Sequence, residues 1–354
     1  MDTARVRAAL LDWYDVSARD LPWRRTRDPY AIWVSEVMLQ QTRVETVIPY
    51  FTRFLARFPT PAALAAASED EVLGLWSGLG YYRRARLLHA GVREVVARHG
   101  GRVPEDAEER RALPGIGAYT CGAIGSIAFD REEPLVDGNV ARVLARLTRL
   151  ETPLGQRDTE RALWAHADAL VRGARPGALN QALMELGATV CTPQRPACAT
   201  CPVRADCAAR AAGVETELPI PREKKAPTPV RLVAVAARTA DDAAARVFVR
   251  GREALFGGLH GLPMQEGEGR DAAKQALTAA GVTARLERAK AGEVVHVLTH
   301  RRLFVEVWRA TGARLRDGAA DARVLRPDAL AAVGVSTLTK KLLACADDPQ
   351  GALF

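Results

Sequence analysis

Hydrophobic and polar positions follow two different patterns along the chain. Up to about residue 212, short apolar segments alternate with helix start and stop signals. Thr60-Pro61 places a capping hydroxyl before a proline at the first helical position, and the Ser-Glu-Asp-Glu run at 68–71 fits a capping box. Residues 81–98 predict a basic helix that closes at Gly100-Gly101. The first region is therefore predicted to be mostly helical.

The second pattern begins after a proline-rich stretch at 215–229, which we interpret as a linker. Beyond it, β-branched and apolar runs such as 246–250 and 303–308 predict strands, and residues 271–280 predict a helix. The sequence thus predicts a helical domain at 1–214, a linker at 215–229 and a smaller α+β domain at 230–354.

Composition and charge narrow the kind of partner. A chain of 354 residues is long enough for about two domains. The net charge of +8 and the pI near 9.4 favour an anionic partner such as nucleic acid or a membrane surface. Charged residues interrupt the apolar positions of 1–20, so we expect no signal peptide, and no apolar run approaches the length of a membrane span. We expect a cytoplasmic protein, in which thiols stay reduced.

Four of the six cysteines are clustered with the spacing C-x6-C-x2-C-x5-C, at Cys191, Cys198, Cys201 and Cys207. Four thiolates suit either a tetrahedral zinc ion or an iron-sulfur cube, and unrelated buried cysteines are the third alternative. Zinc sites usually pair two C-x2-C hooks, and this loop has one. The spacing instead resembles the [4Fe-4S] loop of the endonuclease III superfamily of DNA glycosylases. Cys121 and Cys345 are interpreted as core residues.

A second motif points to the same superfamily. Residues 113–120 place Gly115 and Gly117 at a turn between two helical segments, where glycine lets the backbone approach a ligand and N–H groups face an anion. A plain corner between two helices is the alternative. The motif also resembles the superfamily's helix-hairpin-helix, which grips a DNA phosphate without reading the base sequence.

Two carboxylates are candidates for chemistry. Asp137 stands at the start of an amphipathic helix, where it is either an N-cap alone or also the superfamily's catalytic aspartate. Glu36 lies in an apolar helical stretch. It either faces solvent or sits in a nonpolar pocket that raises its pKa, as a general acid requires near neutral pH.

The resemblance becomes closer when the motifs are taken together. Six segments between residues 20 and 207 resemble MutY-type adenine DNA glycosylases and occur in their order: 21–24, 33–42, 78–82, the hairpin, 136–139 and the cysteine loop. The resemblance implies a helix-hairpin-helix glycosylase fold with an iron-sulfur loop, followed by a Nudix-like domain. It also implies a base excision repair enzyme that binds duplex DNA as a monomer and removes adenine paired with 8-oxoguanine or guanine.

The resemblance assigns roles to the candidate residues. Glu36 matches the acid that protonates adenine at N7, and Asp137 matches the carboxylate that stabilises or traps the sugar as it gains oxocarbenium character. The remaining matches position Asp137 or line the base pocket: Asn139, Tyr119, Arg24, Trp23 and Gln181.

Base removal from a duplex requires the base to be flipped out of the stack. Gln41 and Tyr81 match the family's wedge residues, which fill the gap, and Leu39 matches a residue near the extruded nucleotide. Helix packing and a surface aromatic are the alternative interpretations of these side chains.

Two rival functions make different demands on the sequence. An endonuclease III type enzyme uses a lysine nucleophile and then breaks the strand, but residues 1–223 contain no lysine, and the matching hairpin position is Tyr119. A non-catalytic DNA-binding protein with a cluster as sensor would not need Glu36 and Asp137. We therefore expect base removal that leaves the strand intact.

The second domain resembles the Nudix-like domain with which these glycosylases sense 8-oxoguanine. Where a Nudix hydrolase carries its metal-binding carboxylates, this chain has Lys274-Gln275 and Thr278-Ala279, so recognition is expected and hydrolysis is not. Thr299 and His300 match the residues near the lesion. Alternatively, they are polar residues at a strand end that face solvent.

Overall fold

A computed structural model describes residues 2–223, 226–251 and 256–348. The spatial contacts divide the chain into two compact units. One comprises residues 1–65 and 90–224, and the other comprises residues 66–89 and 225–354. The predicted domains at 1–214 and 230–354 differ from this division chiefly in the helical residues 66–89, which group with the C-terminal residues.

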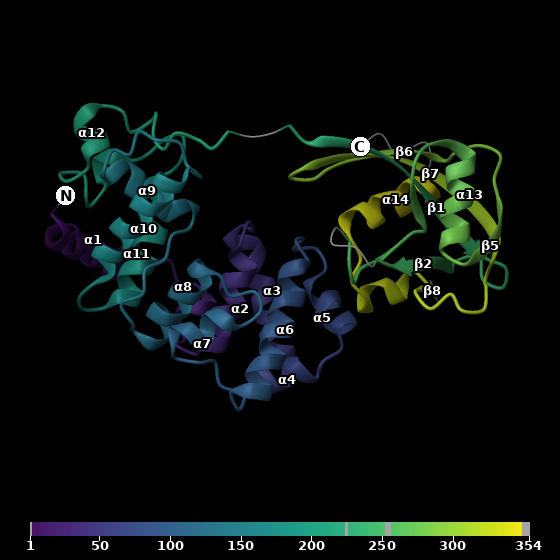
Figure 1. Cartoon of the computed structure of the whole chain (residues 1–354), viewed down its shortest axis with the longest axis horizontal. Helices are drawn as coiled ribbons and strands as arrows, with labels where there is room; N and C mark the ends of the chain where they lie inside the picture. Colours follow the sequence, from purple (N-terminus) through teal and green to yellow (C-terminus); the bar gives the residue numbers. More distant parts are fainter. Residues whose placement is uncertain (1, 224–225, 252–255, 349–354) are drawn as a thin grey trace. The chain divides into compact units, whose positions relative to one another are not determined.

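The region before residue 213 is helical (Figure 1). Its elements are α1 (Thr3–Ser17), η1 (Pro22–Arg24), α2 (Pro29–Leu39), α3 (Val44–Arg57), α4 (Pro61–Ala66), α5 (Glu69–Trp76), α6 (Arg83–Arg98), α7 (Ala107–Ala112), α8 (Ala118–Phe129), α9 (Gly138–Leu147), α10 (Arg157–Val171), α11 (Pro176–Thr189), η2 (Cys198–Thr200) and α12 (Ala208–Ala212).

Local sequence explains where these helices begin. Thr60 accepts a hydrogen bond from the Ala63 amide ahead of α4, and Ser68 accepts one from the Glu71 amide at the start of α5, so both predicted caps are confirmed. The basic helix α6 begins at Arg83, two residues later than predicted, because Tyr81 takes a left-handed backbone conformation with φ 48°.

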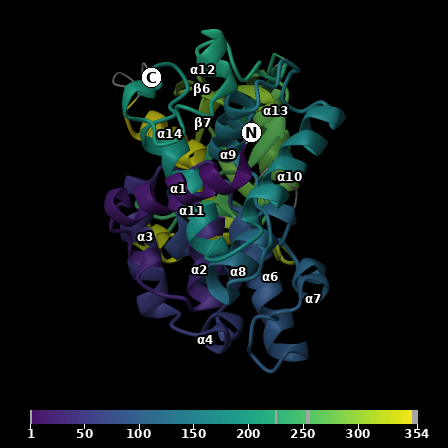
Figure 2. The same ribbon diagram turned by 90° about the vertical axis from the view of Figure 1, so that its left-hand side faces the viewer.

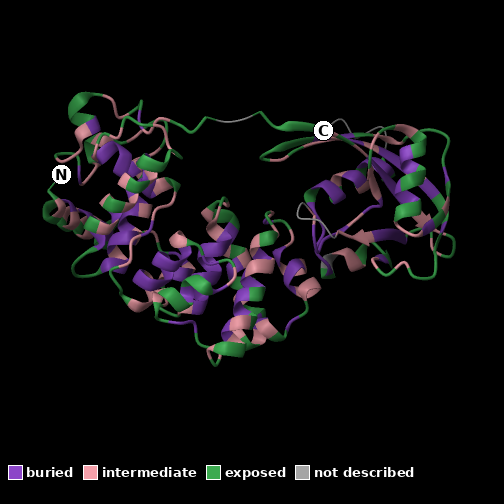
Figure 3. Ribbon diagram, viewed as in Figure 1, coloured by how far each residue is buried: buried purple, intermediate pink, exposed green. Residues whose placement is uncertain are grey.

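The helices that carry the candidate site pack on one another. Helix α2 packs against α8, and α11 packs against both α8 and α9 (Figure 2). Helix α2 is buried from Tyr30 to Met38 (Figure 3). A helix that is apolar on every side must be surrounded by others, and this is why a glutamate within α2 is withdrawn from solvent.

The C-terminal residues form a mixed sheet with a helix on either face. The elements are β1 (Thr228–Thr239), β2 (Arg246–Arg250), β3 (His260–Gly261), β4 (Met264–Glu266), α13 (Gly269–Ala279), β5 (Val282–Leu286), β6 (Gly292–Val297), β7 (Arg301–Leu315), β8 (Ala322–Leu325), η3 (Asp328–Ala332) and α14 (Thr337–Asp347). Strand β1 pairs parallel with β7, and the main strand order is β3-β2-β1-β7-β5.

The alternation of side chains along β1 explains the layering. Val233 and Val235 pack in a cluster with Leu277 of α13, while Ala234 and Ala236 pack in another with Leu342 of α14. Figure 1 shows α13 and α14 on opposite faces of this sheet.

The predicted fold class, helical and then α+β with a Nudix-like domain, is confirmed. Strand β1 begins at Thr228, inside the stretch interpreted as a linker. In the part of the chain that the structure describes, no helix has the length and apolar character to cross a membrane.

Candidate active site

A cavity of about 510 Å³ lies in the helical unit. Side chains from η1, α2, α8, α9 and α11, and from the turn that follows α2, meet at its wall. The predicted site residues among them are Trp23, Arg24, Glu36, Leu39, Gln41, Tyr119, Asp137, Asn139 and Gln181. The structure therefore brings together residues that lie far apart in the sequence.

Glu36 is buried in α2 with 4% of its surface exposed, so the solvent-facing alternative is wrong. Burial raises the pKa of Glu36 to about 7, and the negative charge of Asp137 acts in the same direction. A hydrogen bond from Tyr119 and the charge of Arg24 oppose this rise. Near neutral pH a substantial fraction of Glu36 is therefore protonated.

Tyr119 stands in the first turn of α8 and donates its hydroxyl hydrogen to Glu36 Oε2. Burial and the two nearby carboxylates raise the pKa of Tyr119 well above its ordinary value, so the phenol stays neutral. The phenol therefore occupies one oxygen of the Glu36 carboxyl group.

Asp137 caps α9, which confirms the N-cap prediction. Its Oδ1 accepts a hydrogen bond from the Val140 amide at 2.7 Å, and its Oδ2 accepts one from Asn139 Nδ2 at 3.0 Å. Burial raises the pKa of Asp137, while the two donors favour the ionised form. The carboxylate is held in one orientation beside the cavity.

Arg142, one turn further along α9, connects this carboxylate to the cysteine loop. Its guanidinium donates to Asn139 Oδ1 at 2.9 Å, to the Gly187 carbonyl at 2.7 Å and to the Cys191 carbonyl at 2.7 Å. The Asn139 side chain is thereby fixed from both ends.

Two charged residues of the cavity wall were not among the sequence predictions. Glu185 of α11 is buried and accepts hydrogen bonds from Arg19 at 2.7 Å and from Arg24 at 2.8 Å. Burial opposes ionisation, but the two arginines hold the pKa of Glu185 below its ordinary value. The sequence signal that could have identified Glu185 is a glutamate within an apolar helical stretch, the same signal that identified Glu36.

Gln181 and Trp23 occupy neighbouring parts of this wall. Gln181 Oε1 accepts a hydrogen bond from the Tyr14 hydroxyl at 3.3 Å. Trp23 is 6% exposed and meets Phe51 edge to face, with ring centroids 5.5 Å apart. The cavity wall therefore combines apolar surface with a few polar groups, as a site for a planar heterocycle requires.

The hairpin turn lies between α7 and α8. Gly115 has φ 82°, a conformation that side chains other than glycine rarely adopt. Gly117 is the residue before α8, and nothing lies within 4 Å of a Cβ added there. The open approach leaves the first amides of α8 accessible to an anion such as a phosphate.

The two predicted wedge residues share an unusual backbone. Gln41 has φ 56° and Tyr81 has φ 48°, both in the left-handed region, and each is exposed at a turn. Tyr81 is 51% exposed, and the Arg84 guanidinium lies 5.5 Å from the centroid of its ring. Non-glycine residues held in this conformation are found at functional turns more often than elsewhere.

The four clustered cysteines line one small cavity, together with Arg146, Arg204 and Arg210. Burial, and the proximity of the other thiols, raises the pKa of Cys201 to about 11. In the described part of the chain, no group of three or more His, Cys, Asp or Glu side chains is arranged to hold a metal ion.

The kind and number of these side chains nevertheless suit a [4Fe-4S] cluster, because four thiols line the same cavity and the arginines beside them would balance the charge of thiolates. Cys191 Sγ already accepts a hydrogen bond from Arg146 Nη1 at 3.3 Å. The metal group itself stays a prediction. Cys121 and Cys345, expected to be core residues, are buried.

Thr299 and His300 form an exposed bend between β6 and β7. The Thr299 hydroxyl lies 3.4 Å from the Tyr81 hydroxyl, within hydrogen-bonding distance. Two residues expected to contact DNA on sequence grounds are therefore neighbours within the C-terminal unit.

Comparison with known proteins agrees with the fold. Residues 34–168 match the HhH-GPD superfamily of base excision DNA repair proteins, and residues 234–345 match the NUDIX domain. A solved structure of a thermostable thymine-DNA glycosylase superposes with a TM-score of 0.53 at 29% identity, covering 59% of this chain and 97% of that one. The chain is thus similar to base excision DNA repair proteins of the HhH-GPD superfamily over residues 34–168 and to NUDIX domains over residues 234–345.

Within that superfamily, the chain is similar to adenine DNA glycosylases. The protein of Rattus norvegicus is 54% identical over 217 residues, which cover 59% of this chain and 42% of the relative. The protein of Homo sapiens is 54% identical over 213 residues, which cover 58% of this chain and 39% of the relative. The chain thus spans less than half the length of these two relatives. The resemblance drawn from the sequence motifs is confirmed.

Proposed function

We propose that the protein removes adenine paired with 8-oxoguanine or guanine in duplex DNA and leaves the strand backbone intact. The observation that carries the proposal is the pair of carboxylates at one cavity. Glu36 has a pKa of about 7, and Asp137 is oriented by two hydrogen bonds. Its relatives named adenine DNA glycosylase support adenine as the base.

The carboxylates divide the reaction between them. Protonated Glu36 gives its proton to N7 of the extruded adenine, and the bond between the base and the sugar carbon breaks with its electron pair passing to the base. Asp137 stabilises the positive charge that develops on the sugar, or bonds to the sugar carbon, until water adds there.

The other cavity residues orient the reacting groups. Asn139 holds the Asp137 carboxylate, and Tyr119 holds the Glu36 carboxyl. The base would lie against a wall formed by Arg24, Trp23, Gln181 and Leu39. Gln41 and Tyr81 fill the gap in the duplex, and the turn at Gly115 and Gly117 binds a phosphate.

The remaining parts have supporting roles. The cysteines at 191, 198, 201 and 207 would hold a [4Fe-4S] cluster, which supplies cross-linking of the loop and redox capacity. Thr299 and His300 would recognise the lesion. Because residues 1–223 contain no lysine, the helices that line the cavity offer no side-chain amine for strand cleavage. We infer that the protein acts as a monomer.

Incubation of purified protein with a duplex that carries adenine opposite 8-oxoguanine tests the proposal. Release of free adenine and strand breakage only after alkali are expected. Strand breakage without alkali, or the absence of adenine release, would contradict it. A duplex with thymine opposite adenine serves as the control substrate.

A further inference from the structure

An ion pair between a buried arginine and a half-buried glutamate of the helical region is not used by the proposed mechanism. Arg110 of α7 has no exposed surface, and its Nη2 donates to Glu133 Oε1 at 2.6 Å. Its Nη1 donates to the carbonyls of Pro104 at 3.1 Å and Glu105 at 2.7 Å. A charge buried this completely requires such partners, so the segment containing Glu133 is tied to α7.

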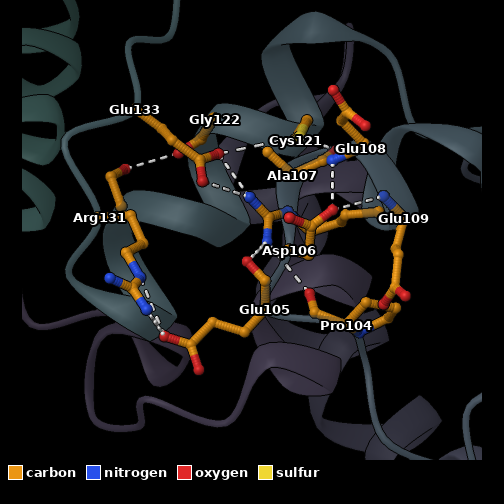
Figure 4. A network of polar contacts seen from close by, with 12 residues as sticks. Pro104, Glu105, Asp106, Ala107, Glu108, Glu109, Cys121, Gly122, Arg131 and Glu133 are labelled. Atoms are coloured by element: carbon orange, nitrogen blue, oxygen red, sulfur yellow. Dashed lines mark hydrogen bonds and ion pairs between the residues drawn. The ribbon is translucent and has the colours of Figure 1, made fainter.

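The same segment is pressed against α8. A Cβ on Gly125 would lie 2.1 Å from Glu133 Oε2, and one on Gly122 would lie 1.9 Å from the Pro134 carbonyl oxygen, so only glycine permits the approach. Figure 4 shows Glu133 beside Gly122 and Cys121. From α11, Asn180 Nδ2 donates to the Glu133 carbonyl at 2.9 Å. Three helices therefore hold residues 133 and 134.

These contacts lie close in the chain to both Tyr119, the partner of Glu36, and Asp137. Helix α8 begins directly after Gly117 and carries Tyr119, the hydrogen-bond partner of Glu36, in its first turn. The segment held against the middle of α8 leads, within four residues of Glu133, to Asp137. The place of Asp137 relative to Glu36 consequently depends on how residues 133–136 lie on α8.

We propose that the Arg110–Glu133 ion pair is a positioning element that sets the Asp137 carboxylate relative to Glu36 and Tyr119. The proposal rests on the proposed function. The pair also joins α7 and the segment after α8, so it fixes the helices on both sides of the hairpin turn. A small displacement of a reacting group is enough to slow an enzymatic step strongly.

The chain offers a matched control close by. Arg131 Nε donates to Glu105 Oε1 at 2.9 Å, joining the same two segments at the surface, where both side chains are more than half exposed (Figure 4). An exposed pair of this kind contributes little to stability. The change Glu105→Gln therefore removes the exposed ion pair between the two segments and leaves the Arg110–Glu133 ion pair in place.

The test compares Glu133→Gln, Glu133→Asp and Glu105→Gln with the parent protein. The first-order rate of adenine release is measured under single-turnover conditions with an adenine and 8-oxoguanine duplex, alongside the dissociation constant for that duplex and the melting temperature. For Glu133→Gln we expect the rate to fall about tenfold at temperatures where the variant is folded. Duplex affinity should fall less than the rate, because the glycines of the hairpin turn, Gly115 and Gly117, are themselves unchanged.

Glu133→Asp keeps the charge but is shorter, so a smaller loss in the same direction is expected. If Glu133→Gln does not fold, the rate of adenine release by Glu133→Asp tests the inference instead. Because Asn139 orients Asp137 directly, the losses from Glu133→Gln and Asn139→Ala should be less than additive. Glu133 variants with the same rate per folded molecule as Glu105→Gln overturn the inference. A parent protein that releases no adenine overturns the proposed function and the inference together.

Discussion

The candidate active site and the loop at Thr299 and His300 differ in how completely the protein organises them. Glu36 and Asp137 are withdrawn from solvent, and each carboxylate accepts hydrogen bonds from fixed donors. Thr299 and His300 are exposed, and a single contact of 3.4 Å joins Thr299 to Tyr81. If the proposed function holds, the reacting groups are positioned before DNA binds, while the loop proposed to recognise the lesion gains its partners from the DNA.

The largest expected effect is the loss of either carboxylate. Asp137→Asn and Glu36→Gln should each lower the single-turnover rate of adenine release by about 10² to 10⁴, since each removes a group that acts on the reacting atoms. Duplex binding should survive in both. Glu45→Gln, on the exposed first turn of α3, is the control. Near-normal turnover by either variant would remove that carboxylate from the mechanism.

The next effect concerns the cysteine loop. The parent protein should be brown, with broad absorption at about 400 nm. The Cys198→Ser variant should lack that absorption, and a smaller fraction of it should be folded. Cys345→Ala, which changes a buried cysteine of the C-terminal core, should keep the absorption. A colourless parent protein that contains stoichiometric zinc would show that the four cysteines bind zinc and not a [4Fe-4S] cluster.

A change of intermediate size is expected in the pH dependence. The acid form of Glu36 is required, so activity should fall as the pH rises through about 7, and the fall at low pH should follow protonation of Asp137. The Tyr119 hydrogen bond lowers the pKa of Glu36, because it stabilises the carboxylate. Tyr119→Phe should therefore move the alkaline limb of the pH–rate profile to higher pH. If the alkaline limb does not move, deprotonation of Glu36 is not the cause of the loss of activity at high pH.

The smallest effect is expected at the exposed loop. Thr299→Ala should reduce the preference for 8-oxoguanine over guanine by several-fold, as the loss of one hydrogen bond worth about 1 to 2 kcal/mol implies. The double change with His300→Ala should reduce it further, and deletion of the residues after Lys225 should reduce it most. Rates opposite plain guanine provide the reference. A preference that survives the deletion would place lesion recognition outside this domain.

The sequence was most informative where one residue meets two requirements. Asp137 was weighed as a helix cap or as a catalytic group, and the structure shows that capping leaves it beside the cavity with its second oxygen held by Asn139. Glu36 could be placed on a helix from the sequence. Its burial could not, because burial depends on α8, a helix about eighty residues further along the chain.

Other features depend on packing that no local pattern records. Glu185 enters the cavity wall because two arginines from the N-terminal region reach α11. Residues 66–89 group with the C-terminal unit, although their helical pattern matches the residues before and after them. The strands at 246–250 and 303–308 were predictable from their β-branched runs, but the parallel pairing of β1 with β7 was not.

The left-handed backbone at Gln41 and Tyr81 has a consequence for how this protein can evolve. Glycine at either position would relieve a conformational cost of about 1 kcal/mol and would be favoured by selection for heat resistance alone. In this protein, larger side chains stand at both positions at the expense of stability. The two turns therefore mark where robustness and activity compete, and a variant selected only for its melting temperature would lose the side chains proposed to enter the duplex.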